Sequence, residues 1–177
     1  MKRRILHYGE EPLRQESKPV TTIDDDLRAL VKDMFETMYQ AHGVGLAAPQ
    51  VGVNLRLFLI DTGNAPMVFI NPEIVKTSGK EICEEGCLSF PGLREKVERP
   101  ARVIARATDL EGKEFEVQAD GLLARAIQHE LDHLDGVLFI DRISKARRIQ
   151  LKRDLERIAA GESLEPDDDA DQADEEA

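Results

Sequence analysis

The chain has 177 residues, of which 41% are hydrophobic and 33% are charged, and its formal net charge at pH 7 is −11. This apolar content is enough for one folded domain and argues against a wholly disordered protein. No apolar run approaches the roughly 18 residues that a membrane-spanning helix requires, and no secretory signal is recognisable. We therefore expect a cytoplasmic protein without a membrane partner.

The negative charge is concentrated at the C-terminus. Residues 162–177 contain nine of the 35 acidic residues and no Lys or Arg, so 26 acidic residues face 24 basic ones in the rest of the chain. An acidic run without aromatic residues cannot bury enough apolar surface to fold. The composition therefore predicts one folded domain over residues 1–161 and a disordered acidic tail over 162–177.

The first predicted element is a helix over 24–41, where five apolar residues recur at helical spacing: Leu27, Leu30, Val31, Met34 and Met38. Asp24 provides a capping side chain at its start. Short apolar runs at 57–60 and 67–70, separated by turn residues, predict two strands. Residues 97–108 read as one extended segment, and the turn at 109–112 leads into a return strand.

A second helix is expected from Asp120 to Gly136, and a third over 144–160, ending at Gly161. The order of one helix, several antiparallel strands and two further helices predicts an α+β fold rather than alternating βαβ units.

The helix predicted over 144–160 is rich in basic residues. Six of them face only two acids, Asp154 and Glu156: Lys145, Arg147, Arg148, Lys152, Arg153 and Arg157. One interpretation is a solvated helix with a basic outer face. The other is a surface for phosphate backbones such as ribosomal RNA, which the neighbouring acidic tail would partly screen.

The sequence His129-Glu130-Leu131-Asp132-His133 lies inside the second predicted helix. Histidines at positions i and i+4 project from one helical face, so both imidazoles can reach one cation. The intervening Glu130 is placed to move a proton on a metal-bound water. The alternative is a pair of incidental helix histidines, which a chain of this composition produces by chance about once in a hundred.

A catalytic metal requires a third protein ligand, and no histidine follows His133. Cys87 is the candidate, because it lies in a segment flanked by Gly86 and Pro91 where the backbone can approach a ligand closely. A sulfur and two nitrogens, with a fourth position left for water, form the layout of a catalytic zinc-type site. A structural site with Cys83 as the fourth ligand is the alternative.

Three segments in order resemble the peptide deformylase family of metal hydrolases. They are Gly-Val-Gly-Leu-Ala-Ala-Pro-Gln-Val-Gly at 43–52, Glu-Gly-Cys-Leu-Ser at 85–89 and Gln-His-Glu-Leu-Asp-His-Leu-Asp-Gly at 128–136. The resemblance extends from near the N-terminus to about residue 160. It implies an α+β catalytic domain in which antiparallel sheets pack around a central HExxH helix, with a C-terminal helix after it.

The resemblance implies a cytoplasmic enzyme that removes the N-formyl group from the N-terminal Met of nascent polypeptides and releases formate. It implies that Cys87, His129 and His133 hold Fe²⁺, for which Zn²⁺, Ni²⁺ or Co²⁺ can substitute. It assigns Glu130 as general base and acid toward a metal-bound water. It also assigns the Gln50 side-chain amide and the Leu88 backbone N–H as donors to the oxyanion.

The resemblance further implies substrate-binding positions. The peptide main chain is expected to pair near Val44, Gly45 and Gly86, and Arg94 to meet carbonyl groups further along the peptide. The pocket for the Met side chain is expected to be formed by Val44, Leu122, Ala126 and His129, with Cys83 as a further candidate. For Val44, Leu122 and Ala126, a role as ordinary core residues is the alternative. His42 and Cys83 depart from the family's usual residues beside the cleft.

Two other functions remain open at this point. One is a metallopeptidase that cuts internal peptide bonds, although the third ligand usual for such enzymes is missing downstream of His133. The other is a non-catalytic ribosome-binding protein that uses the basic residues of 144–160, which can also coexist with the deformylase activity. We expect no DNA partner.

Overall fold

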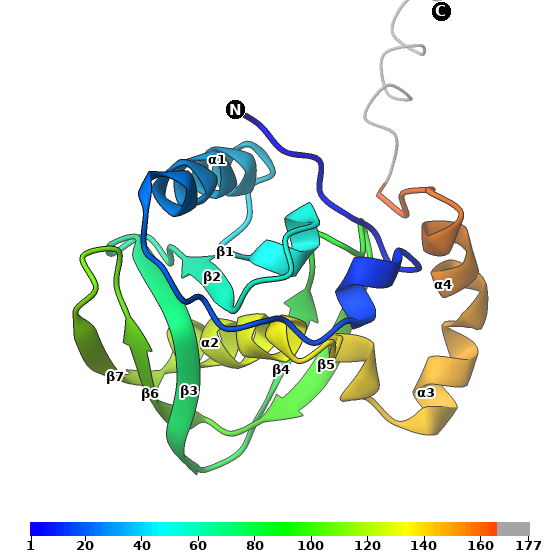
Figure 1. The fold of residues 1–177 in the computed structure, drawn as a ribbon. Helices are drawn as coiled ribbons and strands as arrows, with labels where there is room; N and C mark the ends of the chain where they lie inside the picture. Colours follow the sequence, from blue (N-terminus) through cyan, green and yellow to red (C-terminus); the bar gives the residue numbers. More distant parts are fainter. Residues whose placement is uncertain (166–177) are drawn as a thin grey trace, which may run out of the picture.

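The computed structural model of the protein describes residues 1–165 (Figure 1). In chain order its elements are the 3-10 turn η1 (Glu11–Arg14), α1 (Asp25–Gln40), β1 (Gly45–Ala47), η2 (Ala48–Val51), β2 (Leu57–Ile60), β3 (Met67–Ser78), β4 (Glu81–Gly86), β5 (Arg94–Arg99), β6 (Arg102–Thr108), β7 (Glu114–Asp120), α2 (Gly121–Leu134), η3 (Phe139–Asp141), α3 (Lys145–Gln150) and α4 (Lys152–Ala159).

The strands form two antiparallel sheets. Five strands pair in the order β1-β2-β3-β6-β7, and β4 pairs with β5 in a separate two-stranded sheet. Helix α2 contacts both: its Ala126 and Ile127 join the apolar core of the larger sheet. On the other side, Arg125 donates to the carbonyl oxygens of Val97 and Glu81, each at 2.9 Å. The predicted α+β fold around a central HExxH helix is confirmed, and Figure 1 shows α2 at its centre.

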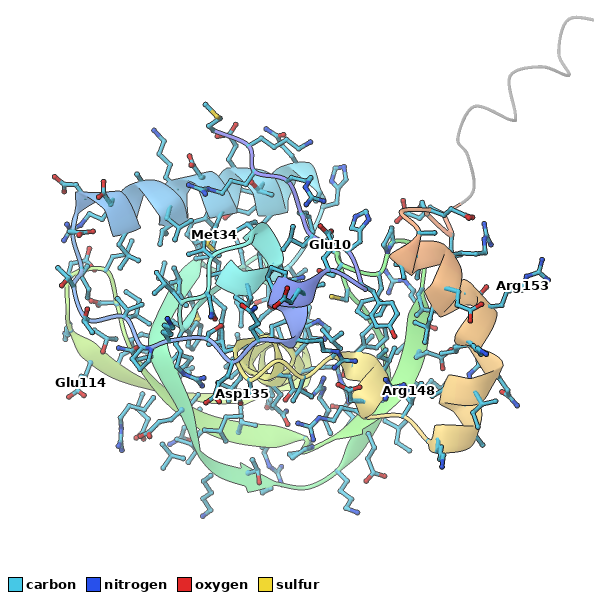
Figure 2. All side chains as sticks on the ribbon, turned by 45° about the vertical axis from the view of Figure 1, so that its right-hand side comes forward. Glu10, Met34, Glu114, Asp135, Arg148 and Arg153 are labelled. Atoms are coloured by element: carbon cyan, nitrogen blue, oxygen red, sulfur yellow. The ribbon has the colours of Figure 1, made fainter. Side chains whose placement is uncertain are left out.

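Helix α1 agrees with its prediction to within one residue at each end. The Asp24 side chain caps it by accepting a hydrogen bond from the Leu27 N–H at 2.9 Å. The apolar face covers β1 and β2, and Met34 is fully buried there. Figure 2 shows Met34 on the side of α1 that faces the strands. This helix therefore closes the core behind β1, the strand that reaches the site.

Two strand predictions were wrong in extent. The strand expected over 67–70 continues to Ser78. The Asn71–Pro72 pair, which usually ends a strand, is accommodated by a β-bulge. The segment expected to be extended over 97–108 is divided at Pro100, and its two parts belong to different sheets. Proline has no N–H to donate to a ladder, so it marks a natural point for this division. The hairpin turn at 109–112 is confirmed by the hydrogen bond from the Asp109 N–H to the Lys113 carbonyl oxygen, at 2.9 Å.

The single C-terminal helix expected over 144–160 consists of two short helices, α3 and α4, that meet at Leu151. Leu151, Leu155 and Ile158 are buried against the body, whereas Ile149 is 65% exposed.

Among residues 1–165, no helix combines the length and the apolar character needed to cross a membrane. Most of the predicted acidic tail, residues 166–177, lies outside the described residues. The first four residues of the predicted tail, 162–165, are described, and the expected disorder of 166–177 stays a prediction.

Candidate metal centre and active site

Helix α2 and the end of β4 bring the three predicted metal ligands together. His129 and His133 are one helical turn apart, with ring centroids 5.1 Å from each other. Cys87 follows β4, and its Sγ lies 3.3 Å from Nε2 of His133. One donor atom from each of the three residues lies within 4.8 Å of the other two. In residues 1–165, this is the group of His, Cys and acidic side chains that could hold an ion.

These distances fit a metal site. Metal–sulfur and metal–nitrogen bonds of about 2.3 and 2.1 Å at a tetrahedral angle place the two donor atoms about 3.6 Å apart. The observed separation of 3.3 Å between Sγ and Nε2 is close to this value. Cys83 does not belong to the group, so the alternative of a four-ligand structural site finds no fourth ligand in it.

Glu130 lies between the two histidines in sequence and is only 5% exposed. Its Oε2 atom has no hydrogen-bond partner among the described residues. Burial raises the pKa of Glu130 to about 7. The carboxylate also lies against Gly45, where an added Cβ would come within 2.5 Å of Oε1. Gly45 is therefore required by Glu130, a constraint that the sequence did not reveal.

Gln50 is buried, and both ends of its side-chain amide are held. The Ala47 N–H donates to Oε1 at 2.9 Å, and Nε2 donates to Ser89 Oγ at 3.1 Å. Nε2 also lies 3.5 Å from the Cys87 Sγ. The amide N–H group of Gln50 is therefore fixed beside the first predicted ligand. The Leu88 side chain packs on the other side against Gly43, where an added Cβ would lie 2.7 Å from Cδ1.

A buried ion-pair network contacts the predicted metal ligand His129. Nδ1 of His129 lies 2.9 Å from Oε1 of Glu85. Arg99 and Arg125 each donate to Glu85 Oε2 at 2.6 Å, and Arg99 also donates to Asp132 Oδ2 at 2.9 Å. Burial alone would raise the pKa of Glu85, but its hydrogen bonds with His129 and Arg99 outweigh burial and lower it to about 2.

This network was not predicted, although one signal pointed to it. Arg99 is two residues after Val97 on β5, so both side chains face the same side of the strand, and both are buried. A charged residue in phase with a core residue requires a buried partner. Sequence alone could not identify Glu85 as that partner, because the pairing depends on how β4, β5 and α2 pack.

The two histidines experience opposite electrostatic effects. Burial alone would lower the pKa of His129, but its contacts with Cys87 and Glu85 raise it well above the usual value. Burial lowers the pKa of His133 well below its usual value, and the charge of His129 adds to this effect. A metal binds the deprotonated nitrogen of a histidine, so a proton and a metal compete for His129 more strongly than for His133.

A cleft of about 770 Å³ opens over the ligand set. It is lined by all six predicted substrate-binding residues: Val44, Gly45, Gly86, Arg94, Leu122 and Ala126. Val44 and Leu122 are 42% and 55% exposed, so they are not ordinary core residues, whereas Ala126 is 5% exposed. His42 also lines the cleft, whereas Cys83 does not.

Comparisons with known proteins agree on one family. The family model for polypeptide deformylase matches residues 2–149. A peptide deformylase of Clostridium botulinum (strain Alaska E43 / Type E3) is 59% identical over 143 residues, which cover 81% of this chain and 97% of that protein. A peptide deformylase of Acidobacterium capsulatum is 50% identical over 168 residues, which cover 92% of this chain and 99% of the relative.

Solved structures extend this similarity to the fold. The crystal structure of a peptide deformylase from Legionella pneumophila is 46% identical, with a TM-score of 0.86, and the match covers 94% of this chain and 100% of that one. A peptide deformylase from Synechococcus elongatus, solved in complex with actinonin, is also 46% identical, with a TM-score of 0.80. That match covers 89% of this chain and 84% of the other.

We predict that Glu85→Gln weakens metal retention about 10- to 100-fold, because a neutral amide holds the His129 ring less firmly than a carboxylate. The same change leaves Arg99 and Arg125 without their shared buried anion, so the free energy of unfolding should fall by about 3–5 kcal/mol. Metal titration and urea unfolding measure the two effects.

The matched control for this prediction is Glu84→Gln. Glu84 is the preceding residue, and its side chain is 58% exposed, so the stability change should stay within about 0.5 kcal/mol. Equal metal retention by wild type and Glu85→Gln would contradict the supporting role of Glu85.

Proposed function

The chain belongs to the polypeptide deformylase family, and from that premise we propose which of its residues perform the reaction. The protein is a metal-dependent hydrolase that removes the N-formyl group from nascent polypeptides. The observation that carries the assignment of residues is the convergence of Cys87, His129 and His133. Of these, Cys87 and His129 line the same cleft as Glu130.

We propose that Cys87, His129 and His133 hold the divalent metal, and that the ion is Fe²⁺, with Zn²⁺, Ni²⁺ or Co²⁺ able to substitute. One thiolate and two imidazoles accept any of these ions. The bound ion supplies Lewis-acid chemistry: it polarises the formyl group and makes a water more acidic. Glu85 supports the site by fixing Nδ1 of His129, which leaves Nε2 for the metal.

Glu130 is proposed as general base and then general acid. Its carboxylate removes a proton from the attacking water while the water oxygen bonds to the formyl carbon. The bond between the formyl carbon and the Met nitrogen then breaks. Glu130 returns the proton to that nitrogen, and formate and a free N-terminal amine leave. The close packing of Glu130 against Gly45 supports this role because it fixes the carboxylate position.

Gln50 and Leu88 are proposed to stabilise the negative charge that develops on the formyl oxygen. Donors that are already aligned cost no reorganisation at the moment of reaction. The Gln50 amide is held at both ends, as such a donor requires. The Leu88 backbone N–H follows directly after Cys87 and supplies the second donor.

The substrate is proposed to lie as an extended peptide between two main-chain segments, Val44–Gly45 and Gly86. The Met side chain then contacts Leu122 and Ala126, and Arg94 reaches carbonyl groups further along. The exposure of Val44 and Leu122 at the cleft supports this placement.

We further propose that the reaction takes place in the cytoplasm and that the basic residues of 144–160 contact the ribosome. Lys145, Lys152 and Arg153 support the contact because they are exposed, and Figure 2 shows Arg153 pointing away from the body. Exposed Ile149 lies on the same segment. Lys152 also lies 3.8 Å from Glu156 on the same helix. Three other basic residues are engaged by acids of this chain, in the pairs Arg147–Glu95, Arg148–Asp141 and Arg157–Glu162.

We predict that Glu130→Gln keeps its metal but loses at least about 100-fold in turnover, because the amide cannot accept the proton. The assay is formate release from an N-formyl-Met peptide by protein prepared anaerobically and loaded with Fe²⁺ or Ni²⁺. Glu111→Gln, in an exposed turn, is the matched control and should behave as wild type.

No formate from metal-loaded wild type would contradict the proposed assignment and the family activity together. Cleavage of an internal bond in an unformylated peptide would support the metallopeptidase alternative. Loss of metal from Glu130→Gln would count against its role as the base.

We also predict that Gly45→Ala lowers kcat by about 10- to 100-fold while metal content is kept. The new methyl group would lie 2.5 Å from Glu130 Oε1, so the carboxylate must move, and displacements of this size cost rate steeply. Steady-state kinetics and metal analysis measure the two quantities. Gly63→Ala is the control, because an added Cβ there meets nothing within 4 Å and Gly63 does not line the cleft. Its left-handed φ of +96° strains an alanine locally, so stability should fall while kcat is kept.

For the ribosome contact, we predict salt-sensitive co-sedimentation of the full chain with ribosomes. Each of Lys145→Ala, Lys152→Ala and Arg153→Ala should reduce the slope of log K against log salt by about one. Lys32→Ala, on the exposed face of α1, is the control. Binding that is unaffected by salt and by these three substitutions would refute the contact.

A further inference from the structure

The segment that follows α4 returns to the cleft rather than leaving the body. Gly161 ends the helix with a left-handed φ of +91°, and its N–H donates to the Ile158 carbonyl oxygen at 2.9 Å. Three residues later, the Leu164 N–H donates to the Pro91 carbonyl oxygen at 2.9 Å. The Leu164 side chain packs against the apolar cluster that includes Phe90. Figure 1 shows the chain turning back after α4.

Because Gly92 has no side chain, the backbone of Leu164 and Glu165 packs directly against it. An added Cβ at Gly92 would lie 2.9 Å from the Leu164 Cα and closer still to the Glu165 backbone nitrogen. Gly92 also has a left-handed φ of +81°, which glycine adopts without strain. Segment 162–165 therefore packs against the loop that begins at Cys87. Within this loop, the Phe90 N–H donates to the Cys87 carbonyl oxygen at 2.8 Å.

This seating places Glu165 in the wall of the cleft that also contains Cys87 and Glu130. The other charged or titratable residues that line the cleft outside the predicted catalytic set are His7, His42, Glu84, Glu85, Arg94 and Arg125. Glu85 and Arg125 pair with each other in the buried network. Glu84 lies 3.8 Å from Arg94 on the exposed rim. Among residues 1–165, no Lys, Arg or His forms an ion pair with Glu165, so its charge remains available to a ligand in the cleft.

The formyl-Met residue carries no charge with which the Glu165 carboxylate can interact. The formyl group removes the charge of the amine, and the Met side chain is neutral. A carboxylate in the cleft wall can therefore discriminate only between the residues that follow Met.

We infer that Glu165 is a specificity-determining residue, which makes the cleft favour formylated peptides whose second residue after Met is Lys or Arg over those with Asp or Glu at that position. The inference rests on the proposed function and deepens it. Because Glu165 is exposed, solvent and salt screen its field, and the effect on relative rates is moderate.

The test compares kcat/KM of the full metal-loaded chain for two C-terminally amidated peptides, formyl-Met-Ala-Lys and formyl-Met-Ala-Glu. In Glu165→Gln, the ratio of Lys to Glu peptide should fall about two- to five-fold relative to wild type. In wild type, about 1 M salt should also lower the ratio of kcat/KM for the Lys peptide to that for the Glu peptide.

The matched control is Glu162→Gln. Glu162 lies three residues earlier, accepts a hydrogen bond from Arg157 Nε at 2.8 Å and does not line the cleft. This variant should keep the wild-type ratio. A ratio unchanged in Glu165→Gln, or changed equally in both variants, would overturn the inference.

The neutral peptide formyl-Met-Ala-Ser separates this failure from failure of the proposed function. Turnover of that peptide with an unchanged Lys-to-Glu ratio refutes only the role of Glu165. Absence of turnover by metal-loaded wild type refutes both.

Discussion

The buried carboxylate of Glu85 holds the site and the fold together. It joins three elements, because it lies on β4 and pairs with Arg99 of β5 and with Arg125 and His129 of α2. Without this anion, Arg125 would keep only main-chain carbonyl partners and Arg99 only Asp132, and incompletely compensated buried charges cost several kcal/mol. The same carboxylate fixes the orientation of the His129 ring. The position of the proposed metal therefore depends on an ion-pair network that also packs the small sheet onto the central helix.

Close backbone approach is the second constraint on the site. Gly45 leaves room for the Glu130 carboxylate, and Gly43 leaves room for the Leu88 side chain. Gly92 does the same for the segment that ends at Glu165. At each of these glycines a methyl group would displace either a residue proposed to act in the reaction or the wall of the cleft. The glycines thus connect the local backbone to the proposed chemistry more directly than their role as turn residues implies.

Local patterns predicted much of this structure. The spacing of His129 and His133 placed both on one face of α2, and the apolar period of α1 gave its bounds to within a residue. Features that depend on distant pairing were missed. The length of β3 depends on its partner β6, and the division at Pro100 depends on two separate sheets. The partner of Arg99 is 14 residues away on another strand, so no local pattern identifies it.

The most direct test of the proposed metal centre is X-ray absorption at the metal edge of Zn²⁺-loaded protein, compared with Cys87→Ser. The account predicts one sulfur at about 2.3 Å and two nitrogens at about 2.0–2.1 Å in wild type, with no sulfur in the variant. Cys83 is the only other cysteine in the chain, so sulfur that persists in Cys87→Ser would point to it. A wild-type shell of nitrogen and oxygen alone, or sulfur that persists in the variant, would contradict the proposed ligand set.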